Sequence, residues 1–347
     1  LLCLALGFMV VGMPVAFSIG IASIVYFLLP GTFMPDSTAV QRIIAASQSF
    51  PLLAVPLFIL VGHLMNGSGI TPRLLTLATT LAGWMRGGLA QTSLLLSALM
   101  GGISGSAVAD AAMQSRVLGP PMVKEGYTRG FTGALLSIGG LITATIPPSL
   151  GLILYGFLGE VSIGRLFIAG IVPGVLLTVA LMIATAWVAR KRDYKPINDR
   201  LPTGREVLSA TRKSFWAILF PVWLVVGIRF GIFTPSEAGA FAVAYAVFVG
   251  VVIYRELSWS DIVDAMLLSV RDIGMIMLII LFSGAFGYVI TFERVPQTLA
   301  ELTLGIFSSQ TMLLITLSLF LLAFGMLVEA TVIVMLLTPI LVPVITA

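Results

Sequence analysis

The residues most able to do chemistry in this 347-residue chain form a short run of small side chains around one carboxylate, GGISGSAVADA at positions 101–111. Its clustered glycines make a continuous helix unfavourable, because each Gly costs about 1 kcal/mol relative to Ala inside a helix. We therefore predict a helical hairpin over about 87–125 that turns near Gly105, with Asp110 organising it. Small residues that let helices pack closely are the alternative, but these would form a regularly spaced stripe rather than a consecutive cluster.

A second interruption follows in GGLITATIPPSLG at positions 139–151. Pro147 and Pro148 each lack a backbone N–H, so we expect a broken helix over about 130–159. The oxygens freed for a cation would come from one stretch: the carbonyls of Gly140–Thr145 and the hydroxyls of Thr143 and Thr145. Such oxygens coordinate Na⁺ in the discontinuous helices of transporters, and the half-helix N-termini suit an anionic substrate. For the proline pair alone, a simple kink would be the better interpretation.

The composition explains which elements must position these residues. Hydrophobic residues make up 59% of the chain, charged residues 10%, and the mean hydropathy is +1.10. Uncharged runs near or above roughly 20 residues are long enough to cross a bilayer as helices. Alternating strand patterns are absent, and backbone polar groups must pair inside lipid. The fold class is therefore an all-α polytopic membrane protein, and its single Cys and single His exclude a metal cluster.

The chain is organised as two similar halves around a basic segment. Eight of its 19 Lys and Arg lie in 190–213, which the positive-inside rule predicts to be a cytoplasmic linker. Shifting the sequence by 222 residues places comparable features of 1–189 onto 214–347, the signature of a transporter built from structural repeats. The second half lacks an equivalent of the last helices of the first, so we expect it to be truncated at its C-terminus. Amphipathic helices along the bilayer surface are predicted at 35–50 and 255–272.

The second half carries its own candidate site in FGMLVEATVIVMLLTPILVPV. Gly325 and Glu329 interrupt an otherwise uncharged region, and an ionisable group at membrane depth is a functional candidate by default. Glu329 could pair within the protein, bind a coupling cation, or be protonated and structural.

An enzymatic interpretation is also open. GISG at 102–105 matches G-x-S-G, the surroundings of an intramembrane serine protease nucleophile, with Ser104 as nucleophile and His63 as its base. The motif is weak in so Gly-rich a chain, and it leaves the repeat and TATIPPS unexplained. The phosphate-binding G-x-x-x-x-G-K-[ST] and the zinc-binding H-E-x-x-H motifs are both absent. We therefore expect no enzymatic activity.

Together, GGISGSAVADA, GPPMVKEGY, GGLITATIPPSLGLILYG and IGRLFIAGIVPG resemble the large membrane subunit of the TRAP (tripartite ATP-independent periplasmic) transporters. The resemblance covers the whole chain and is most specific over 101–174. It implies sodium-driven import of small organic acids, of the C4-dicarboxylate or sialic-acid type, across a bacterial or archaeal inner membrane. It implies an inverted-repeat elevator fold with two re-entrant helical hairpins. The implied partners are a smaller four-helix membrane subunit and a periplasmic substrate-binding protein. A single-polypeptide Na⁺/dicarboxylate elevator symporter is the alternative within transport.

The resemblance also implies site residues. The first hairpin tip is Ser104–Ser106, its supporting helix break is Gly140–Thr145, and the second hairpin starts near Gly325. The expected sodium ligands are Ser104, Ser106, Gly140, Thr143 and Gly325. The residues expected to organise the hairpins or the substrate site are Gly105, Asp110, Thr145, Pro147, Pro148 and Glu329. Na⁺ is the expected coupling ion.

Overall fold

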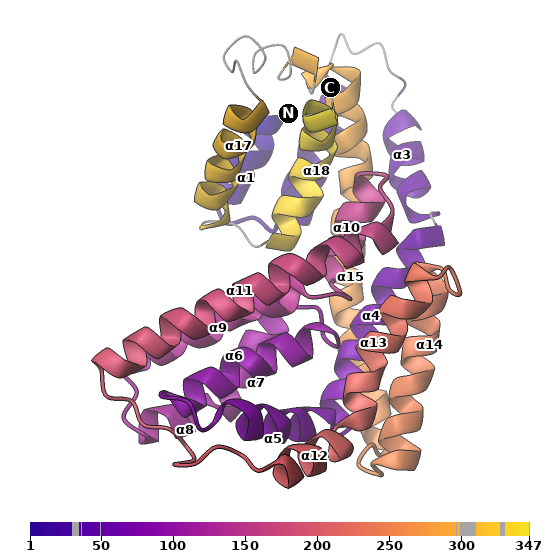
Figure 1. The fold of residues 1–347 in the computed structure, drawn as a ribbon. Coiled ribbons are helices and arrows are strands. Elements are labelled where there is room, and N and C mark those ends of the chain that lie inside the picture. Colours follow the sequence, from indigo (N-terminus) through magenta and orange to yellow (C-terminus); the bar gives the residue numbers. More distant parts are fainter. Residues whose placement is uncertain are drawn as a thin grey trace. The chain divides into compact units, whose positions relative to one another are not determined.

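The computed structural model describes residues 1–29, 35, 37–48, 50–295, 297–298, 310–326 and 330–346. Every regular element in these ranges is helical (Figure 1), which confirms the all-α prediction. The chain divides into two compact units. Unit 1 contains Leu1–Leu52, Leu154–Val161 and Arg271–Ala347, and unit 2 contains Leu53–Ile153 and Ser162–Val270. Unit 2 draws on both predicted halves, so the halves are not two separate compact units.

Unit 1 gathers the terminal helices of the chain. They are α1 (Leu2–Val10), α2 (Val15–Leu28), α3 (Ser37–Ser47), α17 (Gln310–Gly325), α18 (Ala330–Thr346) and the second part of α15 (Trp259–Phe292). Their buried core includes Ile19, Phe286 and Leu336. The Arg42 guanidinium of α3 lies 3.9 Å from the centre of the Tyr288 ring of α15, a cation–π contact that holds these two helices together.

Unit 2 contains the two sequence interruptions. Its helices are α4 (Ala54–Gly67), α5 (Ile70–Ala82), α6 (Gly88–Gly101), α7 (Ala107–Val117), α8 (Gly119–Lys124), α9 (Arg129–Thr145), α11 (Ile163–Lys191), α12 (Gly204–Lys213), α13 (Phe215–Arg229), α14 (Pro235–Phe248), the π-helical η2 (Val249–Ile253) and the first part of α15. A short 3₁₀ turn, η1 (Phe50–Leu53), precedes α4, and α10 (Leu150–Leu158) has residues in both units.

Side-chain caps fix where several of these helices begin. In each, a hydroxyl oxygen accepts the N–H of the residue three positions later, which satisfies a donor that the helix leaves open. The capping residues are Ser106, Thr128, Ser162, Thr203 and Thr234. Thr203 and Thr234 form complete capping boxes with a glutamate at the third helical position.

The described helices are long and apolar enough for a polytopic protein. Three qualify as membrane spans on length and composition: Ile163–Lys191, Pro235–Ile253 and Trp259–Phe292. Three pairs of helices bent by more than 40° at a short break raise the number to as many as 6. One of these pairs is α9 with α10, bent by 49° at the predicted proline break.

The two predicted amphipathic segments have different outcomes. Residues 37–47 form the separate helix α3. Residues 259–272 instead begin α15, which runs unbroken for 34 residues to Phe292. The predicted surface helix over 255–272 is therefore not a separate element, because Gly274, which disfavours a helix at this junction, does not interrupt α15.

The linker between the predicted halves is bound to the base of the first hairpin. Gly87 and Gly88, which open α6, donate their N–H groups to the carbonyls of Tyr194 at 3.1 Å and Lys195 at 3.2 Å. The Tyr194 ring stacks on Tyr127 with 4.1 Å between centroids, and its hydroxyl accepts the N–H of Thr128 at 3.3 Å. The linker therefore contacts both the start of α6 and the start of α9, and this fixes the two ends of the hairpin relative to each other.

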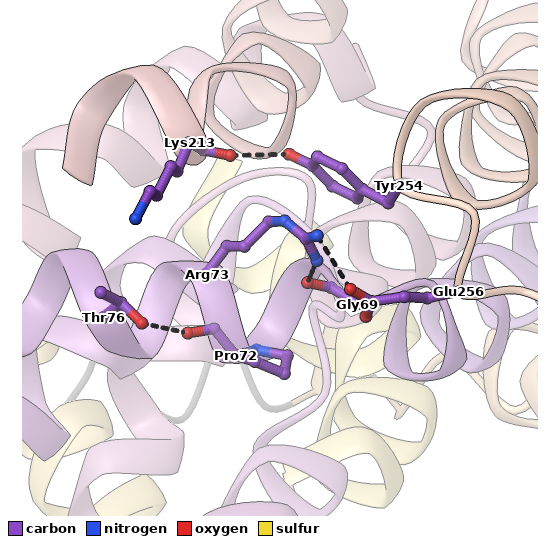
Figure 2. Close-up of polar contacts among 7 residues, drawn as sticks. All are labelled: Gly69, Pro72, Arg73, Thr76, Lys213, Tyr254 and Glu256. Carbon is purple, nitrogen blue, oxygen red and sulfur yellow. Dashed lines mark hydrogen bonds and ion pairs between the residues drawn. The ribbon is translucent and has the colours of Figure 1, made fainter. Parts of the chain in front are cut away.

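Arg73, in the first turns of α5, makes several polar contacts that join helices of unit 2 (Figure 2). Its guanidinium donates to the Gly69 carbonyl at 2.7 Å and pairs with Glu256 at 2.8 Å. It also lies 3.8 Å from the centre of the Tyr254 ring. The carbonyl of Arg73 accepts the hydroxyl of buried Ser214 at 2.9 Å. One residue of the first half thus joins the α12–α13 and η2–α15 corners of the second half, and this positions the helix that leads into the hairpin.

Candidate functional site

The turn of the hairpin packs directly on the proline break. Gly105 has φ +58°, a conformation that glycine adopts without strain, and its carbonyl accepts the N–H of Leu150 at 3.4 Å. A Cβ added at Gly105 would lie 2.6 Å from the Pro148 carbonyl oxygen and 3.0 Å from the Ser149 Cα. The close approach of two non-helical backbone segments therefore requires glycine here.

The carboxylate of Asp110 is the centre of a buried polar network beneath this turn. One of its oxygens, Oδ2, accepts hydrogen bonds from the Ser97 hydroxyl at 2.9 Å, the Gln114 amide at 2.9 Å and the Thr143 hydroxyl at 2.7 Å. Asp110 is 1% exposed, and Ser97, Gln114 and Thr143 are fully buried. These bonds join α6, α7 and α9, because each helix supplies at least one donor. Bonds to a charged acceptor are the stronger kind, so the network fixes the hairpin on α9.

Two oxygens near the turn have no hydrogen-bond partner among the described residues. They are Oδ1 of Asp110 and the hydroxyl oxygen of Ser104. A buried polar oxygen without a partner is costly, so these two atoms are candidates to bind a cation or an ordered water. Ser104 follows the end of α6, and its backbone is adjacent to Gly62 of α4, where an added Cβ would be 3.7 Å from the Ser104 carbonyl oxygen.

The helix break lies later than the sequence indicated. α9 continues through Gly140 and Thr143 to Thr145, and the interruption falls at 146–149. The predicted position of the break at Gly140–Thr145 was too early, because the proline pair, and not the glycines before it, ends the helix. The carbonyls left open by the helix end are those of its last turn. The peptide bond between Pro147 and Pro148 is cis.

Gly140 has a packing role in this structure. A Cβ added there would lie 2.5 Å from the Ala107 carbonyl oxygen at the start of α7. Thr145 donates its hydroxyl to the Leu141 carbonyl of its own helix at 2.7 Å and does not join the Asp110 network. Ser106 caps α7, with its hydroxyl oxygen 3.4 Å from the Ala109 N–H. The network thus brings together two of the predicted site residues, Asp110 and Thr143.

Three members of the network were not predicted: Ser93, Ser97 and Gln114. Ser93 donates to the Gln114 side-chain carbonyl at 2.6 Å, and Gln114 donates to the Ser97 hydroxyl at 2.6 Å. Their spacing carried a signal, because Ser93 and Ser97 lie four residues apart on α6, as Asp110 and Gln114 do on α7. Polar residues at this spacing occupy one face of a helix.

The second-half candidates belong to unit 1 or lie outside the described residues. Gly325 is the last residue of α17 and is exposed. The second hairpin near Gly325 stays a prediction, because α17 ends at Gly325, α18 begins at Ala330, and residues 327–329 lie outside the described residues. Glu329 lies outside the described residues.

The described residues give no support to catalysis by Ser104. Its hydroxyl has no hydrogen-bond partner there, so it lacks the bonded base that nucleophilic catalysis requires. The part of the chain that the structure describes also contains no group of three or more His, Cys, Asp or Glu residues able to hold a metal ion. The groups gathered at the turn are hydroxyl, carbonyl and carboxylate oxygens, which favour a hard cation over a transition metal.

The sequence of this chain is similar to a family of known proteins. The family model described as "Tripartite ATP-independent periplasmic transporter, DctM component" matches residues 2–347. The sialic acid TRAP transporter large permease protein SiaM of Vibrio cholerae serotype O1 is 35% identical over 342 residues, which are 99% of this chain and 79% of that protein. The 2,3-diketo-L-gulonate TRAP transporter large permease protein YiaN of Escherichia coli is 32% identical over 338 residues, 97% of this chain and 79% of that protein.

A further relative is longer. The isethionate TRAP transporter permease protein DctMQ of Oleidesulfovibrio alaskensis is 34% identical over 339 residues, and the match spans 97% of this chain but 53% of that protein. The match to the family model over nearly the whole sequence agrees with the apolar helices and the resemblance carried by residues 101–174. The chain is a multi-pass membrane protein that belongs to the DctM component family of the tripartite ATP-independent periplasmic transporters.

Proposed function

We propose that this chain is the transporting subunit of a sodium-coupled importer of small organic acids. The observation that carries the proposal is the buried Asp110 network beneath the hairpin turn, with one carboxylate oxygen and the Ser104 hydroxyl left without a described partner. Hydroxyl and carbonyl oxygens at a helix break are the coordination that Na⁺ takes in transporters. The relatives support the substrate class, since their names state sialic acid, diketogulonate and isethionate, which are all organic acids.

In this proposal, Na⁺ binds between the hairpin turn and the break that follows α9. Ser104, Ser106 and Thr143 contribute oxygens, while Asp110 supplies the negative charge that favours the cation and positions the Thr143 hydroxyl. The α7 N-terminus, capped by Ser106, adds a positive helix-dipole end that suits a substrate carboxylate. Sodium binding thus organises the site that takes the anion.

The same proposal includes a repeated architecture and an elevator mechanism. α17 and α18 begin 222 and 223 residues after α6 and α7, and this spacing of the helix starts supports the proposed repeat. Gly325 lies at the end of the first helix of that pair. The division into two compact units supports a mechanism in which one body moves against the other. Its partners are a small membrane subunit and a periplasmic binding protein in a bacterial or archaeal inner membrane.

The test is uptake of labelled organic acids into proteoliposomes that contain the full-length permease with its small subunit. The measurement is made with and without an inward sodium gradient, and with and without a candidate binding protein. Uptake that requires both supports the full proposal. Uptake with sodium alone points instead to a symporter that works as one polypeptide. Absence of sodium dependence with a substrate that is transported would overturn the proposed coupling.

A further inference from the structure

One end of unit 2 carries a large surplus of positive charge. The segment 190–213, here called the linker face, contains eight exposed cations against three exposed carboxylates. The cations are Arg190, Lys191, Arg192, Lys195, Arg200, Arg205, Arg212 and Lys213, and the carboxylates are Asp193, Asp199 and Glu206. The surplus is therefore 8 − 3 = +5 within one short segment.

The carboxylates nearest to α12 are already engaged. Glu206 accepts the Thr203 N–H at 2.8 Å and pairs with Arg200 at 2.6 Å. Glu256 is paired with Arg73, and Figure 2 shows the Lys213 side chain pointing away from the Arg73 guanidinium and the Glu256 carboxylate. Among the described residues, Arg205, Arg212 and Lys213 therefore have no ion-pair partner, and their charge is available to a ligand outside the chain.

The linker face also exposes large apolar side chains between its charges. Leu201 is 64% exposed and Leu208 is 70% exposed, the latter on α12 between Arg205 and Arg212. α12 is bent by 67° from α13, the apolar helix that follows it. A short amphipathic helix turned away from the axis of an adjoining apolar helix is typical of a segment that lies in the interface of a bilayer.

We propose that the linker face binds the headgroups of acidic phospholipids in the bilayer leaflet that lies next to it. Unpaired cations would bind the lipid phosphates, while Leu201 and Leu208 enter the boundary between headgroups and acyl chains. The apolar side chains decide between a lipid and a soluble anion, because only a lipid provides an apolar environment next to the phosphate. Lipid binding at the linker face would also contact the proposed transport site indirectly, since the carbonyls of Tyr194 and Lys195 accept the N–H groups at the start of α6.

The test compares two double variants with equal loss of charge. Arg205→Gln with Arg212→Gln removes two unpaired cations of the linker face. Arg165→Gln with Arg229→Gln removes two exposed cations from the opposite ends of α11 and α13. On α11, Arg165 and Arg190 are 25 residues apart, about 37 Å along the helix. The full-length protein in neutral detergent is titrated with phosphatidylglycerol or phosphatidylcholine, and bound lipid is counted by native mass spectrometry.

We expect phosphatidylglycerol to bind more tightly than phosphatidylcholine. Each cation near an acidic surface contributes about fivefold in affinity, so the linker-face variant should bind phosphatidylglycerol roughly 25-fold more weakly. The control variant should bind it as the unmodified protein does. Equal melting temperatures of all three proteins in phosphatidylcholine show that the substitutions leave the fold intact.

Three outcomes would overturn the proposal. The first is equal affinity for the two lipids, and the second is an equal loss in both double variants. The third is thermal stabilisation by soluble glycerol phosphate as large as that by phosphatidylglycerol at the same concentration, since the surface would then recognise a free phosphate. None of these outcomes depends on transport, so the proposal and the proposed function can fail separately.

Discussion

Replacing Thr143 by Val removes one hydroxyl from the centre of the Asp110 network while keeping the shape of the side chain. The Thr143 hydroxyl lies 2.7 Å from Asp110 Oδ2 and 3.0 Å from the Ser97 carbonyl oxygen, and it has one hydrogen to donate. Its bond to the carboxylate is the charged kind, which contributes about 1.5–3 kcal/mol. If this bond positions the sodium ligands, its loss raises the sodium concentration needed for half-maximal activation roughly ten- to hundredfold.

A matched control lies two residues further along the same helix. Thr145 donates its hydroxyl to the Leu141 carbonyl of α9, and so Thr145→Val also removes one hydroxyl without touching Asp110. Thr143→Ser keeps the hydroxyl and loses a methyl group, and it should restore most of the sodium response. Because Thr143 is fully buried and Thr145 is not, both valine variants are first compared by thermal unfolding without sodium.

The assay measures uptake and melting temperature against sodium concentration, with choline replacing sodium so that the ionic strength stays constant. Thr143→Val should need far more sodium in both measurements, and Thr145→Val should behave as the unmodified protein does. The reasoning is refuted if the two valine variants show the same sodium dependence. A lower melting temperature in Thr143→Val with an unchanged sodium response would assign the network to stability alone.

Three further predictions follow from single contacts. Gly105→Ala should lower the melting temperature much more than Gly126→Ala. Both residues have positive φ, but a Cβ at position 105 would meet backbone atoms, whereas one at position 126 would face open space. Equal losses of melting temperature would show that backbone strain alone matters. Arg73→Lys should cost about 1 kcal/mol of stability, since lysine keeps the charge but not the forked guanidinium that meets Glu256 and the Gly69 carbonyl. A double-mutant cycle with Glu256→Gln measures the coupling between the two side chains, and a coupling of zero would contradict this prediction. Burial raises the pKa of Tyr127 to about 12. The neutral phenol therefore stabilises the fold below pH 10, and this stabilisation is lost as the pH rises towards 12. Tyr127→Phe should resist alkaline unfolding better than the unmodified protein, as followed by circular dichroism.

The interruption between α6 and α7 was predictable from sequence because its determinants are local. The small residues clustered at 101–106 disfavour a helix whatever surrounds them, and the structure places Gly105 in the left-handed region there. The helices α6, α7 and α8 lie within Gly88–Lys124, and the re-entrant hairpin over about 87–125 stays a prediction. The proline pair was equally local in its effect, since two successive residues without an N–H leave two carbonyls of α9 without helical donors, whereas the single Pro173 and Pro221 lie inside helices.

The glycines of α9 show why the position of the break could not be predicted. A Cβ added at Gly139 would lie 2.8 Å from the Ser97 hydroxyl, and one at Gly140 would meet the backbone of Ala107. These glycines let three helices approach closely, which is the packing role that small residues have in membranes. Their effect depends on which helices are neighbours, and a single sequence does not contain that information. Ser97 and Gln114 were missed although their four-residue spacing from Ser93 and Asp110 indicated a polar face on each helix, because that spacing does not say which helix each face meets.

In the proposed function, the Asp110 network links cation binding to the position of the turn between α6 and α7 through the charge of its carboxylate. Asp110 receives three donors on one oxygen, but its other oxygen has no described partner, so an ionised carboxylate is only partly compensated in a buried place. In that proposal, a bound cation near the turn reduces this cost, and it does so only while α6, α7 and α9 hold the carboxylate and the hydroxyls together. Cation occupancy and this arrangement of the three helices would then stabilise each other, and the coupling would be reciprocal by thermodynamic necessity. In the proposed function, the same reciprocity makes the anion site form when sodium is bound.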